Sequence, residues 1–562
     1  MLNPKVEIRT SSQVKIPSFK MRFWVAILFT LIIAGLILYF GMPVLSFRFT
    51  GWIVPLMICF IPLTGIRRIR KVLFTLGFFL VAWLILVPLF SSGMFNPGKY
   101  RNLIGEVEKT EFGELVSPVN LDQVPIIDSA FASSLAEKKL GEDFALGSRV
   151  TLGTPTIQMV QNRLFWVIPL LHSGFYKWFT NRENGTPGYI KVSATNPQDV
   201  TFVRRLNGKP MSIRYQRNSY FGQDLYRHLY FNGFAGKGLA GDTFEIDDNG
   251  EPYWTISTYT HKIGVSGEEA TGLITVHAET GEITYYPVVK TADGYDDSNI
   301  PAWVDRVHPS YFVIPQLSWW GKYVNGFWNT LFGKRDMLEV TRGYNVIYGR
   351  DQRSYFYTGL SSVGADEGTV GFSLTDTRDK SSHLYLLSGA TELAAMRSAE
   401  GKVQNFNYYA TFPILVNING KPTYFMTLKD GAGLVKMFSF VSVRDFSLVG
   451  VGETVRHAKD NYQMALAGSR IGTIPEGSEK PLQIEGTVTR FGSDTKDGRT
   501  YYYFKLAEHP AKIYIANSNL SAYLPLTRSG DRIRVSYLDS EDIEISLTKL
   551  ENLSLEEVLE KE

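Results

Sequence analysis

Three long runs of apolar residues near the start of the chain stand apart from the mixed pattern of the rest. Phe23–Phe47, Phe49–Ile66 and Val72–Phe90 carry no charged side chain over 25, 18 and 19 positions. A helix needs roughly 20 apolar residues to cross the hydrocarbon core of a bilayer. We therefore predict three transmembrane helices within residues 23–90. Because the second run is the shortest and contains Pro55 and Pro62, the alternative for it is a re-entrant or interfacial hairpin.

The lysine and arginine residues that flank these runs predict an orientation, because cytoplasmic flanks are richer in them. Five precede the first run, one separates the first two runs, and four separate the second from the third. Three crossings then place the tail 1–22 in the cytoplasm and the chain beyond residue 90 outside it. We expect a multi-pass protein of the cell membrane, with the lipid bilayer as a partner. If the second run does not cross, the large C-terminal region lies in the cytoplasm.

Beyond a connecting segment at 91–160, one strand pattern recurs through residues 161–470. Each copy has an adjacent aromatic pair in a strand-like run, then a glycine-containing connection, then an alternating strand. The four pairs are Phe165-Trp166, Tyr253-Trp254, Tyr355-Phe356 and Tyr424-Phe425. Helix-like segments occur at Ser219–Phe231, Pro301–Phe332, Ala390–Val403 and Glu453–Ala467. Because a strand of period two buries one face and an amphipathic helix can cover it, we predict tandem α+β modules with small antiparallel sheets.

One of these copies resembles a known family. The run Gly272–Tyr286 reads GLITVHAETGEITYY, a strand with alternating apolar residues, an acidic-x-Gly turn and a second strand. This is similar to the signature of PepSY-type domains. The other copies depart from it, for example at Asp379-Lys380-Ser381, where the turn glycine is missing. The resemblance implies an extracytoplasmic protein and a connection with protease regulation.

The sequence pattern of residues 482–550 differs from that of the modules before it and predicts a separate small barrel. Five short strands, with a helix-like insert at Leu520–Leu524 after the third, resemble the OB type of barrel. Such barrels often bind single-stranded nucleic acid through stacked aromatic residues. From residue 482 to the end, however, 10 Lys or Arg face 14 Asp or Glu, including an acidic tail at 551–562. We therefore expect no nucleic acid as a partner and a structural or protein-docking role for the barrel.

The composition of the chain limits the number of domains and the kinds of functional site that we expect. The 562 residues exceed a single core and predict two to four packed units, and the net charge of +3 does not favour a polyanion as partner. The single cysteine, Cys59, excludes disulfide frameworks and cysteine-based metal sites. The eight histidines are scattered, and no nucleophile elbow, His-Glu-x-x-His or phosphate-binding loop occurs. The acidic run Glu245–Glu251 is better interpreted as a hairpin turn than as a calcium loop. We predict no catalytic residue, no metal and no cofactor.

Two aromatic-rich segments are candidates for binding. One runs from Tyr220 to Phe231 and the other from Trp303 to Trp328. Packing between modules is the simpler interpretation of both, and a partner or ligand surface is the alternative, because Tyr, Trp and Arg are enriched at such surfaces. The candidate binding residues are Tyr220, Tyr226, Arg227, Trp303, Trp319, Trp320 and Trp328.

The function that these features favour is a non-enzymatic integral membrane protein with a large extracytoplasmic binding or assembly platform in the cell envelope. Its expected partners are other envelope proteins or further copies of itself. The alternative is an envelope hydrolase or a regulator of an extracytoplasmic protease. A deep cavity that gathers acidic or histidine side chains from several modules would overturn the platform and favour the alternative.

Overall fold

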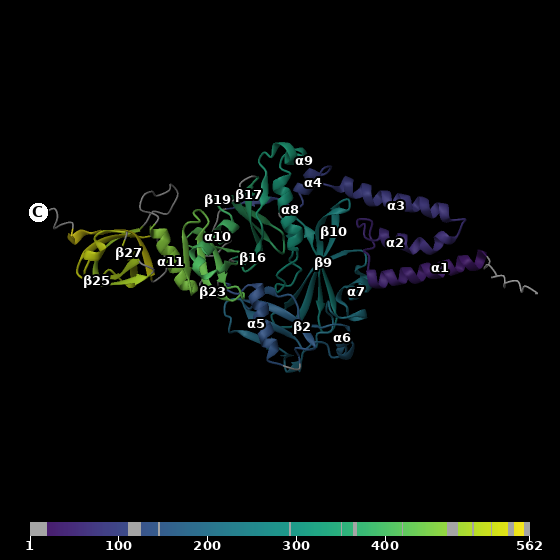
Figure 1. Cartoon of the computed structure of the whole chain (residues 1–562), viewed down its shortest axis with the longest axis horizontal. Helices are drawn as coiled ribbons and strands as arrows, with labels where there is room; N and C mark the ends of the chain where they lie inside the picture. The colour runs from purple at the N-terminus through teal and green to yellow at the C-terminus, as the bar shows by residue number, and fades with distance from the viewer. Residues whose placement is uncertain are drawn as a thin grey trace, which may run out of the picture.

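Three helices project from one side of a body built of small sheets, and a barrel lies at the opposite end of the molecule (Figure 1). This arrangement comes from a computed structural model. The residues it describes are 19–110, 125–143, 146–291, 294–349, 351–363, 368–418, 420–468, 482–496, 499–518, 520–537 and 544–555. Most of the predicted cytoplasmic tail and of the acidic tail lies outside them.

Two of the apolar segments form helices that are long and apolar enough to cross a membrane. The first is α1 (Phe19–Leu36), continued by a π-helical turn η1 (Ile37–Gly41), and the second is α3 (Arg70–Ser91). The middle segment forms only α2 (Ile53–Phe60) and a 3-10 turn η2 (Ile61–Gly65), which are shorter. Pro62 explains the early end of α2, because proline has no N–H to continue the helical hydrogen bonds.

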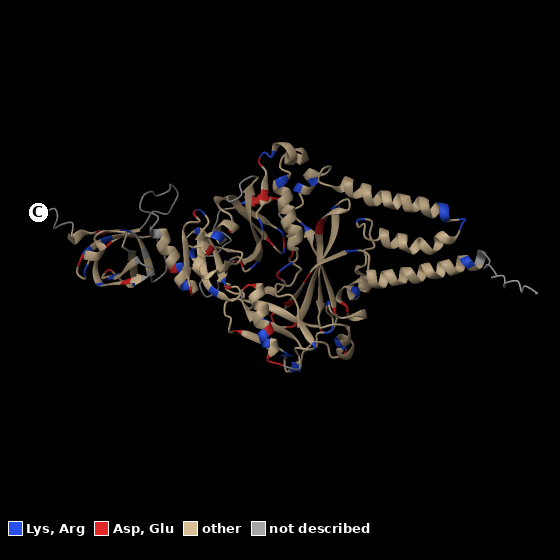
Figure 2. Ribbon diagram, in the orientation of Figure 1, with Lys and Arg blue, Asp and Glu red and all other residues tan. Residues whose placement is uncertain are grey.

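Both long helices end against the body. Arg227 donates from Nε to the carbonyl of Tyr39 at 2.9 Å, and the hydroxyl of Tyr230 donates to the carbonyl of Pro43 at 2.9 Å. At the end of α3, the carbonyl of Ser91 accepts from the hydroxyl of Tyr100 at 2.9 Å. α1 and α3 therefore run in the same direction, and α2 returns between them (Figure 1). Figure 2 shows Lys and Arg at the ends of α1 and α3 that lie far from the body.

Four small sheets make up the body, and their pairings are antiparallel except where β1 (Val107–Lys109) joins β19 in parallel. Sheet 1 contains β2 (Val150–Leu152), β3 (Thr156–Val160), β4 (Arg163–His172), β5 (Tyr189–Ser193) and β6 (Val200–Val203). Sheet 2 contains β9 (Gly238–Ile246), β10 (Pro252–Ile263), β11 (Ser266–His277) and β12 (Ile283–Pro287). The prediction of small antiparallel sheets is confirmed.

The second half of the body repeats this plan. Sheet 3 contains β15 (Leu338–Val340), β16 (Asn345–Tyr348), β17 (Ser354–Ser362), β18 (Gly368–Asp376) and β19 (Ser382–Ala390). Sheet 4 contains β20 (Tyr409–Ala410), β21 (Ile414–Ile418), β22 (Lys421–Lys429), β23 (Val435–Ser442) and β24 (Val449–Gly452). Residues 150–160, predicted as part of a connecting segment, supply two strands of sheet 1.

Helices cover the outer faces of three sheets. α5 (Ser129–Gly141) packs on sheet 1, α8 (Ser310–Lys322) on sheet 3 and α11 (Val455–Gly468) on sheet 4. α10 (Glu392–Lys402) joins the core shared by sheets 3 and 4. Two predicted helices are much shorter than expected: α7 covers only Leu225–Leu229, and residues 301–309 form an irregular connector before α8.

The repeated aromatic pairs lie on one central strand of each sheet and divide between its two faces, as the period of two in a strand requires. Sheets 1 and 2 share one core, and sheets 3 and 4 share another. One aromatic of each pair enters the shared core, namely Phe165, Trp254, Tyr355 and Tyr424. The other aromatic faces the opposite side: Trp166, Phe356 and Phe425 pack with the helices, and Tyr253 stacks on Trp303.

The C-terminal region forms a closed five-stranded barrel with the strand order β25-β26-β27-β29-β28. Its strands are β25 (Leu482–Lys496), β26 (Arg499–Leu506), β27 (His509–Asn517), β28 (Arg532–Tyr537) and β29 (Glu544–Asn552). The predicted insert after the third strand is a 3-10 turn, η8 (Leu524–Leu526). The barrel has a core of its own, in which Phe504, Tyr514 and Ile533 are buried.

A buried ion pair joins sheet 2 to sheet 3. Nζ of Lys380 lies 2.5 Å from Oε1 of Glu269, and each side chain is only 3% exposed. The ammonium also donates to the carbonyl of Leu103 at 2.8 Å and to Oε1 of Gln316 at 3.1 Å. Burial lowers the pKa of Lys380, although the neighbouring Glu269 opposes the shift. Removing one partner would leave a charged group without compensation inside the protein.

We predict that Lys380→Met lowers the free energy of unfolding by about 3 to 5 kcal/mol, because it leaves the Glu269 carboxylate buried and unpaired. Lys139→Met is the matched control, since it removes an exposed pair with Glu142 and should cost about 0 to 1 kcal/mol. Urea denaturation of the detergent-solubilised protein measures both. Equal losses in the two variants would show that the buried pair does not join the sheets.

Candidate functional site

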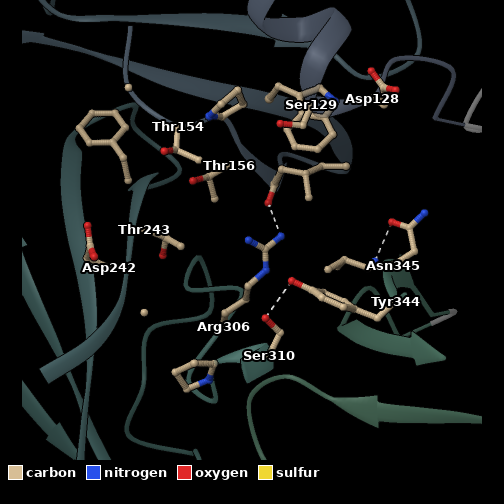
Figure 3. A pocket seen from close by; sticks show the side chains of 18 of the residues that line it. Asp128, Ser129, Thr154, Thr156, Asp242, Thr243, Arg306, Ser310, Tyr344 and Asn345 are labelled. Atoms are coloured by element: carbon tan, nitrogen blue, oxygen red, sulfur yellow. Dashed lines mark hydrogen bonds between the residues drawn. The ribbon is translucent and has the colours of Figure 1, made fainter. Parts of the chain in front are cut away.

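A cavity of about 1390 Å³ lies where the four sheets and the connector meet. Sheet 1 contributes Thr156, sheet 2 contributes Thr243, sheet 3 contributes Asn345, and sheet 4 contributes Thr427. Figure 3 shows hydroxyl-bearing side chains from different elements turned toward the same space. The lining combines these polar groups with aromatic rings, so the cavity can hold a ligand that has both polar and apolar parts.

Arg306 is the charged group nearest the middle of this view (Figure 3). It comes from the connector, and its Nη2 donates to the carbonyl of Ile157 at 2.9 Å. Its Nε is buried and has no hydrogen-bond partner among the described residues. A guanidinium carries five N–H donors and always keeps its charge. Arg306 therefore brings donor capacity and a positive charge to the cavity.

The neighbouring residue Asp305 fixes the position of Arg306. Its backbone N–H donates to Oε2 of Glu245 at 3.1 Å, and its carbonyl accepts from Oγ of Ser354 at 2.9 Å and from Oγ1 of Thr377 at 2.6 Å. Its Oδ2 accepts from the hydroxyl of Tyr348 at 2.6 Å and from the N–H of Met159 at 3.0 Å. Sheets 1, 2 and 3 thus all hold Asp305.

Two carboxyl groups are buried close to Arg306. Burial, together with the nearby charge of Asp305, raises the pKa of Glu245 to about 7, although the charge of Arg306 opposes the shift. Burial likewise raises the pKa of Asp305. Glu245 accepts hydrogen bonds from the hydroxyls of Thr243 at 2.9 Å and Thr255 at 3.1 Å. Because these two carboxyl groups repel one another, the cluster holds a proton more readily than isolated carboxyl groups would.

The acidic groups that line the cavity, Asp128 and Asp242, are engaged with cations or hydroxyls. Oδ2 of Asp242 lies 3.2 Å from Nε of Arg217, and its Oδ1 accepts from the hydroxyl of Tyr226 at 2.7 Å. Asp128 caps α5 and lies 2.6 Å from Nζ of Lys429. Each of these two carboxylates is therefore already bound to side chains of the protein, and we assign both a structural role.

His308 also lines the cavity, and burial, aided by Lys380, lowers its pKa. A neutral imidazole in that position can donate or accept a hydrogen bond. Within the described ranges, no group of three or more His, Cys, Asp or Glu residues is arranged to hold a metal ion. The site therefore offers hydrogen bonds and two arginines, Arg217 and Arg306, rather than a metal centre built from His, Cys, Asp or Glu.

The structure separates the candidate binding residues that the sequence suggested. Only Tyr226 lines the cavity. Trp319 packs on Tyr100 with ring centres 4.7 Å apart, and Trp320 lies under the guanidinium of Arg101. The remaining four lie elsewhere. Trp303 stacks on Tyr253, and Trp328 is exposed and stacks on Phe332. Tyr220 is exposed beside Phe175, and Arg227, which is mostly buried, donates to the carbonyl of Tyr39 near the end of α1.

Sequence reasoning missed Arg306 because residues 301–309 were interpreted as part of a helix. The run Pro301-Ala-Trp-Val-Asp-Arg-Val-His-Pro309 begins and ends with proline and contains an aspartate, an arginine and a histidine between apolar residues. Charged residues in an irregular segment that joins two modules are a signal for a site. No protein-family model and no curated protein sequence matches the chain.

We predict that Glu245 contributes a fall in stability as the pH rises from about 4.5 to about 7, because the folded protein keeps a proton on Glu245 that the unfolded chain releases. The lowered pKa values of His172 and His308 act in the opposite direction, so the contribution of Glu245 is measured by comparison with its variant. Glu245→Gln should reduce this fall by about 2 to 3 kcal/mol. Part of the slope should persist, since the pKa of Asp376 is also raised, to about 6. Unfolding free energies across this pH range test the prediction, with the exposed Glu142→Gln as control. A slope that Glu245→Gln leaves unchanged would contradict it.

Proposed function

We propose that the protein is a non-enzymatic, membrane-anchored binding protein of the cell envelope, whose extracytoplasmic body holds a ligand in the cavity between its four sheets. The observation that carries this proposal is Arg306, which lines the cavity next to Asp305, a residue held by three sheets. The guanidinium donates to the carbonyl of Ile157, and its buried Nε has no hydrogen-bond partner among the described residues. Building such a group into a polar cavity costs stability, and a ligand that accepts its hydrogen bonds offsets that cost.

The anchoring part of the proposal extends to three membrane crossings. α1 and α3 run in the same direction, and both end at the body. If both helices cross the membrane, the chain that joins them must cross it once in the opposite direction. Residues 53–65 are the segment available for it, in spite of their short length. The lysine and arginine residues at the far ends of α1 and α3 (Figure 2) favour a cytoplasmic location for those ends. The body would then lie outside the cytoplasm.

The chemistry of the cavity favours a ligand with an anionic group. Arg306 can form paired hydrogen bonds with a carboxylate or a phosphate. Around it, Thr154, Ser310 and Tyr344 offer hydroxyl groups to the polar parts of such a ligand (Figure 3). The hydroxyl of Ser310 already donates to that of Tyr344 at 2.9 Å, which holds both in place.

Family resemblances add two further proposals. The hairpin of β11 and β12 has the strand, turn and strand arrangement that suggested a PepSY-type module, with Gly281 at its turn in the left-handed region (φ 77°). The strand order of the barrel, with β27 and β29 parallel, supports an OB-like barrel. Its interior is filled by its own side chains, and we propose that its outer surface docks other envelope proteins or further copies of the chain, and not nucleic acid.

The alternative, an envelope hydrolase or a regulator of an extracytoplasmic protease, also has an observation in its favour. Asp128, Asp242 and His308 reach the same cavity from different parts of the fold. A hydrolase would use one of them as a general base or acid. We favour binding because both aspartates are already engaged with Lys429 or Arg217.

We predict opposite labelling of single cysteines on the two sides of the membrane. In a Cys59→Ser background, Phe406→Cys on the body should react with a membrane-impermeant maleimide in intact cells or spheroplasts. Arg67→Cys, between α2 and α3, should react only after permeabilisation. Both side chains are exposed, so differences report location. Labelling of Arg67→Cys, but not of Phe406→Cys, in intact cells would reverse the proposed orientation.

We predict that Arg306→Gln weakens anion binding by about 10- to 100-fold, since a hydrogen bond to a charged group is worth about 1.5 to 3 kcal/mol. The full-length protein in detergent is titrated with inorganic phosphate, citrate and glucuronate, and binding is followed by calorimetry. Arg342→Gln is the control, an exposed arginine two residues before Tyr344. Unchanged affinity in Arg306→Gln, or no binding of any of the three anions to the native protein, would overturn the proposed ligand class.

A further inference from the structure

An exposed cluster of aromatic side chains lies on the body near the membrane helices. It consists of Phe175, Tyr176 and Phe179 on α6 (Phe175–Asn181), together with Tyr220 and Phe221, and we name it the aromatic patch. Tyr176 is 72% exposed and Phe179 is 51% exposed. Large exposed apolar patches on a protein mark binding surfaces, because leaving them in water is unfavourable.

The side chains of the aromatic patch are held in place by contacts with one another and with buried residues. The ring of Phe175 lies 5.1 Å from that of Tyr220, and Trp178 beneath them is buried and lies 5.7 Å from Phe221. Nε1 of Trp178 donates to Oε1 of Gln223 at 2.8 Å, which joins α6 to the 3-10 turn η4 (Phe221–Gln223). These contacts hold the exposed rings in fixed positions.

The backbone of Phe221 supports a role for its exposed ring. Its φ is 51°, in the left-handed region, which a bulky residue rarely adopts. The carbonyl of Phe221 accepts a hydrogen bond from Nη1 of Arg227 at 3.1 Å. Strained conformations of this kind cluster at binding sites.

The aromatic patch is continuous with the end of α1 that meets the body. Arg227 joins the two: besides its bond to Phe221, its Nε donates to the carbonyl of Tyr39 at 2.9 Å, and its guanidinium lies 4.9 Å from the centre of the Tyr39 ring. Figure 1 shows α6 and α7 on the side of the body from which the helices extend. If α1 crosses the membrane, the residues around Tyr39 lie at its surface, and the aromatic patch lies beside them.

We propose that the aromatic patch rests in the headgroup region of the outer leaflet and forms a second contact between body and bilayer, an inference that depends on the proposed crossing of α1. Aromatic rings with polar tips concentrate at this depth of a membrane, where one part of the side chain is apolar and the other is wet. Arg182, over the ring of Phe179 at 5.2 Å, can reach lipid phosphates. This contact fixes the tilt of the body on the membrane.

Spin labels in the full-length protein test this contact. Single cysteines replace Tyr176, Phe179, Phe406 or Ile85 in a Cys59→Ser background, and the labelled proteins are reconstituted into phosphatidylcholine and phosphatidylglycerol vesicles. Collision rates with oxygen, which concentrates in lipid, and with a water-soluble nickel chelate are then compared. Ile85 is an exposed position on α3. Phe406 is exposed in the short turn that follows α10, and Figure 1 shows α10 away from the three N-terminal helices.

We expect the oxygen-to-nickel ratio at positions 176 and 179 to lie between the high ratio at 85 and the low ratio at 406, and at least three-fold above the latter. Ratios at 176 and 179 equal to that at 406, with a high ratio at 85, would overturn the lipid contact but leave the membrane anchor intact. Low collision rates with both reagents at 176 and 179 would also overturn it, in favour of a protein partner. A low ratio at 85 as well would overturn the anchor and, with it, this inference.

Discussion

The arrangement of the body depends on how one buried residue, Asp305, is held. Its backbone and carboxylate together use hydrogen-bonding groups from sheets 1, 2 and 3, and all of these groups are buried or partly buried. A buried polar group without its partner costs about 1 to 3 kcal/mol. The partners of Asp305 are therefore satisfied only when the three sheets meet in this one arrangement. That arrangement also determines where the neighbouring Arg306 points.

The small sheets pair because none of them can bury both of its faces alone. Each has only four to six strands, and each presents an aromatic residue on both faces of a central strand. Pairing buries one face, and a helix or the connector buries the other. An aromatic side chain buries roughly 150 to 250 Å², so at about 25 cal/mol per Å² the two faces stabilise the fold far more than any surface ion pair.

The sequence allowed the small sheets, the helices α10 and α11, the five-stranded barrel and two helices of spanning length to be predicted, because these depend on local periodicity. It did not allow the pairing of sheet 1 with sheet 2 to be predicted. Phe165 and Trp254 belong to the same core, but they are far apart in the sequence, and no local pattern indicates that they are in contact. The site was missed for the same reason. Arg306 acquires its position from partners of Asp305 that are 43 to 146 residues away in the chain. Tyr226 was the one predicted residue that reached the cavity.

The cavity lies between two halves of the body that have separate main cores and that meet through polar contacts as well as small apolar ones, such as Tyr259 of sheet 2 against Phe312 of α8. The core of sheets 1 and 2 and the core of sheets 3 and 4 are separate clusters. Between them, Arg378 donates to the carbonyl of Val304 at 2.7 Å and lies 2.6 Å from Asp297, and Lys380 pairs with Glu269. Apolar surfaces are most stable when they pack without gaps. Hydrogen bonds and ion pairs instead hold particular atoms at set distances and do not require the surfaces around them to close. A junction made of such bonds can hold the halves firmly and still leave a polar space at its centre.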